Sequence, residues 1–326
     1  MNKMKKKVLV CGSTGFIGRN IAETLAEMNE FDVTGTYFTS PPLTHPNIHS
    51  VYADLRDIHY VKEIMRNKDI IIQAAATTSG SKDIVTKPYI HVTDNAVMNS
   101  LIFRVAYDFN ISHVIFFSCT VMYQSSENPI AESDFNASED IHEKYFGIGW
   151  TKVYLEKICE FYSRLNQNKY TVIRHSNIYG PHDKYDLEHS HVFGATITKI
   201  MTSRNGKIDV WGDGSEKRDL LYISDLVYFV LLAIYKQKST FELVNVGSGQ
   251  FITVKELVLK IIQCSGKQIA VSYDLTRPNI PISIRLDISK AYRLFNWKPS
   301  IPLMDGIKKT LDWYTKENQY FKENYV

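Results

Sequence analysis

A glycine-rich turn directly after the first apolar segment is the feature that most limits how this chain can fold. The turn reads Gly12-Ser13-Thr14-Gly15-Phe16-Ile17-Gly18. It follows the short apolar run Lys6–Cys11, and a pattern typical of a helix continues from Gly15 to about Met28. Glycines at such a position let the backbone approach a phosphate, and the helix N-terminus supplies free N–H groups with partial positive charge. The turn therefore predicts a strand–turn–helix unit that binds the pyrophosphate of a dinucleotide.

Apolar runs alternate with helical patterns over the next part of the chain. Further strands are predicted near Asp32–Phe38, Ile48–Ala53, Ile70–Ala74, His113–Ser118 and Tyr170–Arg174. Helices are predicted over Asp57–Asn67, Val92–Phe109 and Ile141–Leu165. Continuously apolar strands separated by helices are typical of a parallel sheet that is buried on both faces. The predicted fold class is therefore α/β, with a doubly wound parallel sheet of the Rossmann type.

The rhythm of strands and helices breaks after Asn177, where proline and aspartate residues indicate a long loop. It returns weakly with a helix at Ser224–Tyr235, a strand at Phe241–Val246 and a last helix from about Leu303 to Thr315. We therefore expect a dinucleotide-binding domain made of residues 1–176 plus about 222–247. A smaller C-terminal α/β substrate domain would comprise about 177–221 plus 248–326.

Composition and charge exclude several classes of protein. The 326 residues are 44% hydrophobic and 22% charged, which suffices for one or two globular domains. A net charge of +3 is too small to predict nucleic-acid binding. The start of the chain does not fit a signal peptide, and no apolar run reaches the roughly 18 residues of a membrane span. The four cysteines show neither disulfide nor metal spacing, so we expect a cytoplasmic protein with reduced thiols and no bound metal.

The end of the second strand bears on which nicotinamide cofactor would bind. NAD-binding folds usually place an acid there to hold the ribose 2′-OH, but Thr36–Ser40 contains no Asp or Glu. Without a carboxylate, nothing at this strand end repels a 2′-phosphate. Arg19, Thr39 and Ser40 are available to contact such a phosphate. The sequence therefore favours NADP(H) over NAD(H).

Taken together, the motifs resemble those of the extended short-chain dehydrogenases that act on nucleotide sugars. Besides the glycine turn, the resemblance rests on Asp54-Leu55, Ala74-Ala75-Ala76, Ser118–Tyr123, Lys152, Asn177–Pro181, Trp211–Gly214, Arg218-Asp219, Asp225-Leu226 and Asn245–Gly247. It spans nearly the whole chain and implies a nicotinamide-dependent oxidoreductase. The residues that it implies for cofactor binding are Gly12, Thr14, Gly15, Phe16, Ile17, Gly18, Asp54, Leu55, Ala74, Ala75, Ala76, Lys152 and His175.

One loop is more specific within that superfamily. The stretch Tyr179–Tyr185, followed by Ser190-His191-Val192, is similar to the same loop of GDP-L-fucose synthases. Those enzymes epimerise C3 and C5 of a GDP-4-keto-6-deoxy sugar and then reduce C4 with NADPH. The resemblance therefore implies a GDP-linked sugar as substrate, with the histidine of the Ser-His-Val turn as an acid. The substrate-binding residues implied are Asn177, His191, Val192, Trp211, Arg218 and Arg285, of which the arginines suit a diphosphate.

The expected catalytic helix departs from the family pattern. Lys152 stands where family lysines bind the nicotinamide ribose and lower the pKa of a proton donor. The Tyr expected four residues earlier is Ile148, which cannot donate a proton. The Ser or Thr that normally binds the sugar oxygen falls on Cys119, with Thr120 beside it. Where GDP-L-fucose synthases have their cysteine base, this chain has Val121.

Tyr145 is the predicted substitute for the missing donor. It lies seven residues before Lys152, which places both on one helix face if the helix already runs there. Gly147 and Gly149 would permit a kink that brings Tyr145 closer. His191 is a further acid or base, because imidazole changes charge near physiological pH. The predicted catalytic residues are Lys152, Tyr145, Thr120, Cys119 and His191.

Three functions remain open at this point. The first is reduction of a 4-keto group on a nucleotide-diphosphate sugar, with a GDP-linked sugar favoured. The second is a 4-epimerase or 4-dehydrogenase that holds its NAD tightly. The third, suggested by Ile148, is a cofactor-binding protein with weakened catalysis. The resemblance also implies a homodimer that pairs through Val92–Phe109 and Ile141–Leu165.

Overall fold

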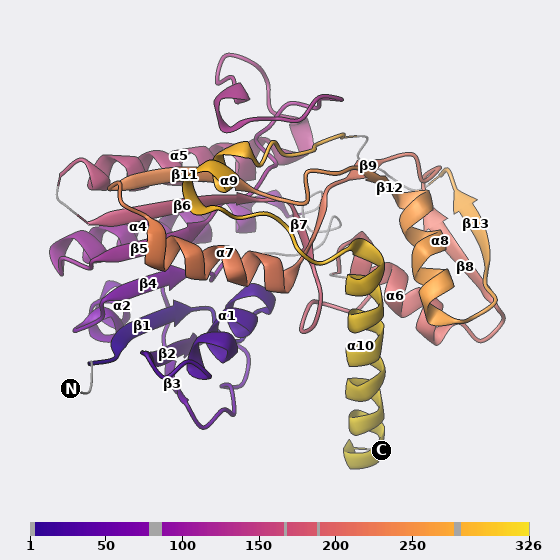
Figure 1. Ribbon diagram of the computed structural model, residues 1–326, viewed down its shortest axis with the longest axis horizontal. Helices are drawn as coiled ribbons and strands as arrows, with labels where there is room; N and C mark the ends of the chain where they lie inside the picture. Colours follow the sequence, from indigo (N-terminus) through magenta and orange to yellow (C-terminus); the bar gives the residue numbers. More distant parts are fainter. Residues whose placement is uncertain (1–3, 78–86, 166–167, 188–189, 277–281, 326) are drawn as a thin grey trace.

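The computed structural model describes residues 4–77, 87–165, 168–187, 190–276 and 282–325, and Figure 1 shows their arrangement. A large sheet with helices on both sides takes up one part of the molecule. A second group of helices and short strands lies beside it, beyond β7 in the figure. The helix α10 (Leu303–Tyr325) stands near the second group.

Within the described residues, seven parallel strands form one sheet in the order β11-β6-β5-β4-β1-β2-β3. The strands are β1 (Lys6–Cys11), β2 (Phe31–Tyr37), β3 (Ile48–Tyr52), β4 (Ile70–Gln73), β5 (His113–Phe117), β6 (Lys169–His175) and β11 (Phe241–Val246). In this sheet Val8 pairs with Val33 on one side and with Ile70 on the other. The order of the strands reverses between β1 and β4, which is where ligands bind in open α/β sheets. The predicted doubly wound parallel sheet is confirmed.

Both faces of the sheet are covered because successive side chains of the inner strands are apolar and point to opposite faces. Val8 and Val10 pack toward one face, whereas Leu9 and Cys11 pack toward the other. The first face carries α1 (Phe16–Ala26), α7 (Ile223–Lys236) and α9 (Ser289–Phe295). The second face carries α2 (Ile58–Met65), α4 (Thr93–Asp108) and α5 (Phe146–Ser163). The 3-10 turns η1 (Pro88–His91), η2 (Glu132–Asp134) and η3 (Glu143–Tyr145) lie in the connections.

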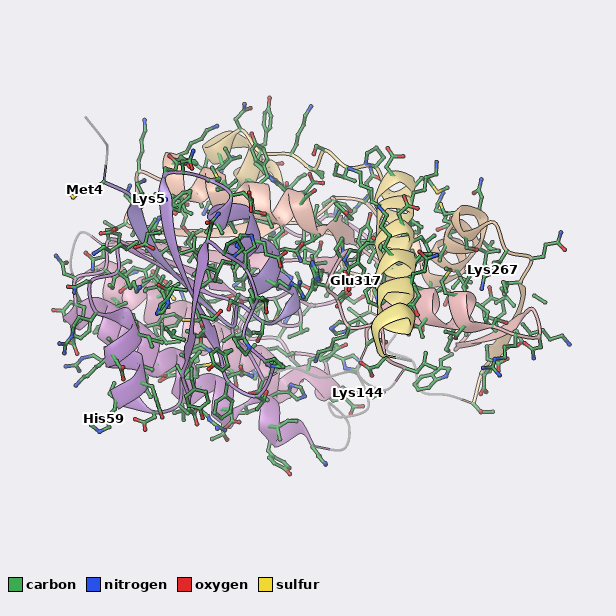
Figure 2. All side chains as sticks on the ribbon, turned by 90° about the horizontal axis from the view of Figure 1, so that it is seen from below. Met4, Lys5, His59, Lys144, Lys267 and Glu317 are labelled. Atoms are coloured by element: carbon green, nitrogen blue, oxygen red, sulfur yellow. The ribbon has the colours of Figure 1, made fainter. Side chains whose placement is uncertain are left out.

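The second group is built from short strand pairs and three helices. The pairs are β7 (Asn177–Tyr179) with β10 (Leu220–Tyr222), β8 (Lys207–Trp211) with β13 (Ala270–Asp274), and β9 (Lys217–Arg218) with β12 (Ile252–Thr253). The helices are α6 (Val192–Thr202), α8 (Val254–Ser265) and α10. In Figure 2, Glu317 on α10 lies between the sheet, marked by His59, and the end of the second group at Lys267. None of the helices among the described residues is long and apolar enough to cross a membrane.

The structure corrects three of the predicted segments. The helix predicted over Ile141–Leu165 was wrong at its start, because α5 begins at Phe146 after the turn η3. The loop predicted after Asn177 is present over residues 180–187, but it is shorter than expected, since β7 precedes it and α6 and β8 follow it. The last helix continues beyond Thr315 to Tyr325. These elements were missed because α6 and β8 are short and pack against each other and α8 rather than against the sheet.

Gly147 and Gly149 do not unwind α5, contrary to the prediction of a kink. Helix α5 is continuous through both residues. A Cβ at Gly147 would lie 2.8 Å from Cγ2 of Val92, and one at Gly149 would lie 3.0 Å from the side chain of Ile141. The two glycines therefore allow the start of α5 to pack closely against neighbouring segments.

Candidate functional site

The glycine turn after β1 is shaped by close backbone contacts. Gly12 has φ +73°, and a Cβ there would lie 2.6 Å from Cα of Ala75 in the loop after β4. A Cβ at Gly18 would lie 2.2 Å from the carbonyl oxygen of Gly12. These two positions therefore require glycine so that β1, α1 and the loop after β4 can approach one another.

The N-terminus of α1 offers hydrogen-bond donors without a cap of its own. Gly15 is the exposed N-cap residue, with no side chain to cap the helix, and the first turn contains no acidic residue. The backbone N–H groups of Phe16 and Ile17 are in the first turn, where a helix has no internal acceptors. Free donors and the helix dipole suit an anion. The turn thus fits the pyrophosphate of a dinucleotide, with Gly15 facing the ligand side.

Asp54, which we expected to contact the cofactor, is engaged by an arginine. Arg56 donates from Nε to Oδ1 and from Nη2 to Oδ2 of Asp54, both at 2.9 Å. Arg56 also lies 3.2 Å from Asp94 and 5.3 Å from the ring centre of Phe38. The side-chain hydrogen bonds from Arg56 lower the pKa of Asp54. The next residue, Leu55, is buried in the core below.

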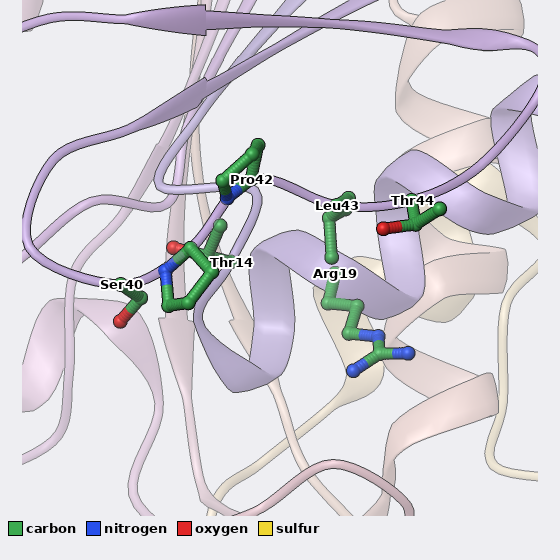
Figure 3. A pocket seen from close by; sticks show the side chains of 7 residues that line it. Thr14, Arg19, Ser40, Pro42, Leu43 and Thr44 are labelled. Atoms are coloured by element: carbon green, nitrogen blue, oxygen red, sulfur yellow. The ribbon is translucent and has the colours of Figure 1, made fainter.

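A pocket of about 370 Å³ opens beside this end of the glycine turn. Figure 3 shows Thr14 and Arg19 from the turn and α1, facing Ser40, Pro42, Leu43 and Thr44 from the segment after β2. The pocket therefore combines a guanidinium group with hydroxyl groups at the end of the second strand, which suits a phosphate.

The three alanines after β4 are held by a buried polar network. Gln73 donates from Nε2 to the carbonyl oxygen of Ala75 at 3.1 Å and to Oδ1 of Asn99 at 2.9 Å. The backbone N–H of Thr77 donates to Oδ1 of Asn95 at 3.0 Å. Asn95 and Asn99 belong to α4, so this helix fixes the loop that faces Gly12. Ala74 and Ala75 are partly buried and Ala76 is exposed along this loop.

Lys152 is buried where α5 meets the end of β5. Its Nζ donates to the carbonyl oxygen of Phe117 at 2.8 Å. Burial lowers the pKa of Lys152, while Cys119 and Glu156 act in the opposite direction. Glu156, one turn further along α5, forms a buried ion pair with Arg174 at 2.6 Å and accepts from Oγ of Ser118 at 2.5 Å. The network fixes Lys152 and the loop after β5 relative to β6.

Tyr145 lies close enough to two predicted site residues to interact electrostatically. Burial raises the pKa of Tyr145, whereas the positive charge of Arg218 lowers it and Cys119 raises it. The thiol of Cys119 also has its pKa raised by burial, opposed by Lys152 and by the backbone N–H of Val121. Cys119 thus lies within electrostatic range of both Lys152 and Tyr145, although Tyr145 precedes α5 as its N-cap residue. Thr120 is partly buried beside Cys119.

Two histidines adjoin this cluster. His175 ends β6, and its Nδ1 lies 2.8 Å from the carbonyl oxygen of Ser176. Burial lowers the pKa of His175 to about 4, and the charges of Lys152 and His191 act in the same direction. His191 is the N-cap residue of α6, which begins at Val192. Part of the His191 surface is open to solvent, yet crowding by protein atoms lowers its pKa, and Lys184 adds to the shift.

The remaining predicted substrate residues lie in the second group of elements. Asn177 at the start of β7 donates from Nδ2 to the carbonyl oxygen of Asp219 at 3.2 Å. Arg218 donates to the carbonyl oxygens of Lys217 and Ile282, and burial lowers its pKa. Arg285 lies 5.0 Å from the ring centre of Phe251. Trp211 ends β8 with an exposed ring that faces Lys199 at 5.8 Å.

Sequence reasoning missed Arg56 and the network of Glu156 with Arg174. Arg56 is two residues beyond Asp54, so it does not lie at the end of the second strand in the sequence. The pairing of β2 with β3 brings it to the ring of Phe38. The spacing of Glu156 four residues after Lys152 was the available signal, because it places both on one face of α5.

A family model described as the NAD dependent epimerase/dehydratase family matches residues 8–247 of this chain. The GDP-L-fucose synthase of Azorhizobium caulinodans is 28% identical over 328 residues, which cover 97% of this chain and 99% of the relative. The GDP-L-colitose synthase of Yersinia pseudotuberculosis is 26% identical, with 95% of this chain and 98% of the relative covered.

Solved structures share the fold at lower identity. The UDP-glucose 4-epimerase of Thermotoga maritima, solved with UDP-glucose, aligns with a TM-score of 0.85 and 24% identity. The alignment covers 96% of this chain and 99% of that one. The arrangement of the sheet and the second group is therefore shared along almost the whole chain.

Proposed function

The chain belongs to the NAD dependent epimerase/dehydratase family, and from this premise we propose that it reduces the C4 keto group of a GDP-linked sugar with NADP(H). It is a nicotinamide-dependent enzyme by its family. The specific substrate is drawn from the likeness to GDP-L-fucose synthase and GDP-L-colitose synthase over nearly the full chain.

One observation carries the proposal. Lys152 acts on the pKa of Cys119 and His175, and Arg218 and Cys119 act on the pKa of Tyr145, so each of these five residues lies within electrostatic range of at least one other. These residues come from the carboxyl ends of β5 and β6, from the start of α5 and from β9. A ketone reduction needs cationic and proton-donating groups beside the reacting oxygen, and β5 and β6 end at the same edge of the parallel sheet as β1, which leads into the glycine turn.

In this proposal each side chain has a defined task. When bound, the nicotinamide supplies the hydride that reaches C4. Lys152, held by the Phe117 carbonyl, binds the ribose and keeps a positive charge beside the reacting oxygen. Tyr145 donates the proton to that oxygen, and Arg218 favours the ionised phenolate left behind. Thr120 or Cys119 orients the oxygen by a hydrogen bond.

The choice of NADP(H) is supported by the two arginines at the adenosine end. Arg19 lines the pocket with Thr14 and Ser40, and Arg56 lies over Phe38. Asp54, the nearby carboxylate, is paired with Arg56, so its charge is offset. A 2′-phosphate placed in this pocket would meet the guanidinium of Arg19 and several hydroxyl groups, whereas a 2′-OH would make no use of the charge of Arg19.

The nucleotide sugar would bind between the sheet and the second group. We assign residues 1–176 plus about 222–247 to a dinucleotide-binding domain, and about 177–221 plus 248–326 to a sugar-binding domain. The diphosphate would bind to Arg218 and Arg285, and the sugar would lie near His191, whose acid role remains part of the proposal. The other proposed substrate contacts are Asn177, Val192 and Trp211.

The second candidate function is 4-epimerisation with a tightly held nicotinamide. It is favoured by the similarity of the fold to UDP-glucose 4-epimerase over nearly the whole chain. An epimerase returns the hydride to the same sugar, so it needs no net supply of reduced cofactor. A reductase consumes one NADPH for each sugar, which separates the two functions.

The proposed assembly is a cytoplasmic homodimer. Helices α4 and α5 lie side by side, and Val97, Tyr154, Phe161 and Leu165 are exposed apolar side chains on or next to them. Tyr154, Phe161 and Leu165, with Ile158, follow the spacing of one helix face. A second copy of the chain packing on this face would bury them.

The function is tested by mixing the purified protein with NADPH and GDP-4-keto-6-deoxymannose and following NADPH absorbance. We expect stoichiometric oxidation of NADPH and a GDP-6-deoxyhexose product on mass spectrometry. UDP-glucose without added cofactor is the parallel assay. Conversion of UDP-glucose to UDP-galactose, with no oxidation of NADPH in the first assay, would replace the reductase by the epimerase.

A further inference from the structure

Glu23 lies between the pocket at the adenosine end and the loop that follows β7. Arg19 lines the pocket, and its Nε donates to Oε1 of Glu23 at 2.7 Å. The other carboxylate oxygen of Glu23 lies 3.6 Å from Nε2 of His182. Figure 3 shows Arg19 reaching from α1 along the segment that carries Leu43 and Thr44. One carboxylate is therefore shared by a cofactor-side residue and a residue of the loop that leads toward His191.

The loop around His182 is held between two helices. Nδ2 of Asn20 on α1 donates to the carbonyl oxygen of Pro181 at 3.0 Å. The ring of His182 packs edge-to-face on Trp313 of α10, with 5.0 Å between ring centres. Tyr185 packs on the same tryptophan at 5.5 Å. A change in the attachment of His182 would therefore change how this loop is held against α1.

The charges around His182 explain why its contact with Glu23 is weak. The charged groups that act on it are Arg19 and Glu23 of α1, while α10 contributes the uncharged ring of Trp313. Its neighbours on its own loop are Asp183 and Lys184. Burial lowers the pKa of His182 to about 4, Arg19 lowers it as well, and Glu23 opposes both. At neutral pH the imidazole is therefore uncharged, and it lies 3.6 Å from the carboxylate.

We propose that Glu23 couples the two ligands: a phosphate on Arg19 strengthens the Glu23–His182 contact and fixes loop 180–187 against α1. The inference rests on the proposed use of NADP(H), because the 2′-phosphate is the group that would place an additional anion in the pocket lined by Arg19. Such an anion offsets the positive charge that disfavours protonation of His182. Glu23 is then a positioning residue, since it acts through Arg19 and His182.

Coupling of this kind is reciprocal. If a 2′-phosphate raises the affinity for the nucleotide-sugar side, the nucleotide raises the affinity for the 2′-phosphate by the same factor. We expect a factor on the order of fivefold, the lower end of common coupling strengths. The factor should be larger below neutral pH than at pH 7, because protonation of His182 puts a positive charge on its contact with Glu23.

The experiment uses the full chain with 2′,5′-ADP, 5′-AMP and GDP as probes. Amide hydrogen exchange of residues 180–187 is measured with each adenine nucleotide, and calorimetry gives the GDP affinity in its presence. The variants are Glu23→Gln, which removes the charge, and His182→Asn, which leaves the Arg19–Glu23 pair intact. Asn is chosen because His182 has φ +69° and Asn tolerates that conformation. Glu27→Gln is the matched control, since Glu27 at the C-cap of α1 lies 3.1 Å from His45 in the segment after β2.

We expect 2′,5′-ADP, but not 5′-AMP, to protect residues 180–187 and to raise the GDP affinity about fivefold. Both effects should vanish in Glu23→Gln and His182→Asn and persist in Glu27→Gln. Near pH 5, wild type should take up more protons than His182→Asn on binding 2′,5′-ADP, because wild type alone has the imidazole at position 182 to protonate. The proton change of the phosphate itself is the same in both proteins and cancels in the comparison. Tighter binding of 2′,5′-ADP than of 5′-AMP without loop protection would overturn the coupling alone. Equal binding of the two nucleotides would overturn both the coupling and the preference for NADP(H).

Discussion

Single side chains determine the chemistry proposed for this protein. In our proposal Ile148 stands where the family has its tyrosine, and the phenol proposed to replace that tyrosine is Tyr145. Its pKa is raised by burial, which keeps the phenol protonated and able to donate. Arg218 acts against that rise, so the phenolate that follows donation is favoured by a nearby cation.

Tyr145→Phe should slow reduction of the sugar by about 10²–10⁴-fold, the usual contribution of a positioned general acid. Binding of the nucleotide sugar should be unchanged, because only the hydroxyl is removed. Single-turnover kinetics with saturating substrate measures the rate. The control is Tyr292→Phe, an exposed tyrosine on α9.

An unaltered rate in Tyr145→Phe would mean that Tyr145 is not the proton donor and that His191 or water supplies the proton instead. Ile148→Tyr gives a second readout at the same site. If Tyr145 is the donor, the added phenol should crowd the sugar pocket and weaken substrate binding. A faster reaction in Ile148→Tyr would instead mean that a catalytic tyrosine has been lost at position 148.

A buried histidine should make stability depend on pH. Burial lowers the pKa of His113 to about 3, and Lys169 and Lys6 act in the same direction. Its Nε2 lies 2.8 Å from Oγ1 of Thr171. The pKa of His113 in the folded chain lies below its unfolded value of 6.5. The neutral imidazole therefore makes its full contribution to stability above pH 6.5, and this contribution is lost as the pH falls toward 3.

His113→Gln should therefore flatten the acid side of the stability curve. The free energy of unfolding of wild type should fall by up to about 1.4 kcal/mol more per pH unit than that of the variant below pH 6.5. Urea unfolding at pH 7 and pH 5 provides the comparison, with His59→Gln on the exposed face of α2 as control. Parallel curves for wild type and His113→Gln would contradict this account.

Among the elements, the strand–turn–helix unit contains glycines with two different roles. Gly12 and Gly18 are needed for folding, whereas Gly15 is available for ligand binding. Gly12 and Gly18 face backbone atoms at distances that no Cβ could occupy. Gly15 has an extended conformation that any residue can adopt, and its nearest contact would be at 3.4 Å. It is exposed at the helix N-terminus, where the pyrophosphate would bind.

Gly15→Leu should abolish binding of the cofactor while changing the free energy of unfolding by less than about 1 kcal/mol. Gly18→Ala should instead destabilise the fold by about 1–3 kcal/mol, since its Cβ would overlap the Gly12 carbonyl. Calorimetry with NADPH and NADH, together with urea unfolding, distinguishes the two effects. Unchanged affinity of Gly15→Leu for both cofactors would remove the pyrophosphate assignment.

At the scale of the whole molecule, the site is formed by groups from both parts of the chain. Tyr145 and Lys152 come from the region before β6, whereas Arg218 and His191 come from the second group of elements. The proposed dimer surface on α4 and α5 lies on the second face of the sheet, together with α2. The proposed dimer surface therefore shares no element with the pocket of Figure 3, which is lined by the glycine turn, α1 and the segment after β2.

Phe161→Glu should dissociate the proposed dimer, because a carboxylate would have to be buried without a partner. The side chain of Phe161 is 55% exposed in the single chain, so the substitution should leave the fold intact. Light scattering across a range of concentrations measures the mass. Tyr228→Glu on α7, 49% exposed, is the matched control and should stay dimeric. A wild-type mass equal to one chain at all concentrations would rule out the dimer.

The sequence by itself determined the sheet, the glycine turn and the covering helices. These follow from local patterns: apolar runs, helical periodicity and glycines between them, all read from neighbours in the chain. The roles of Lys152 and Ile148 were drawn from the family resemblance and stay predictions. The start of α5 escaped it, since the turn η3 before Phe146 also has a helical pattern.

Only the tertiary structure decided which distant groups meet. Arg56 reaches Phe38 through the pairing of β2 with β3, and Glu23 reaches His182 through the contact of α1 with the loop after β7. Tyr145 acquires Arg218 as a neighbour across the two parts of the molecule. Such contacts depend on how elements pack, which no local pattern encodes, and they determine the charges and pKa values on which the proposed chemistry depends.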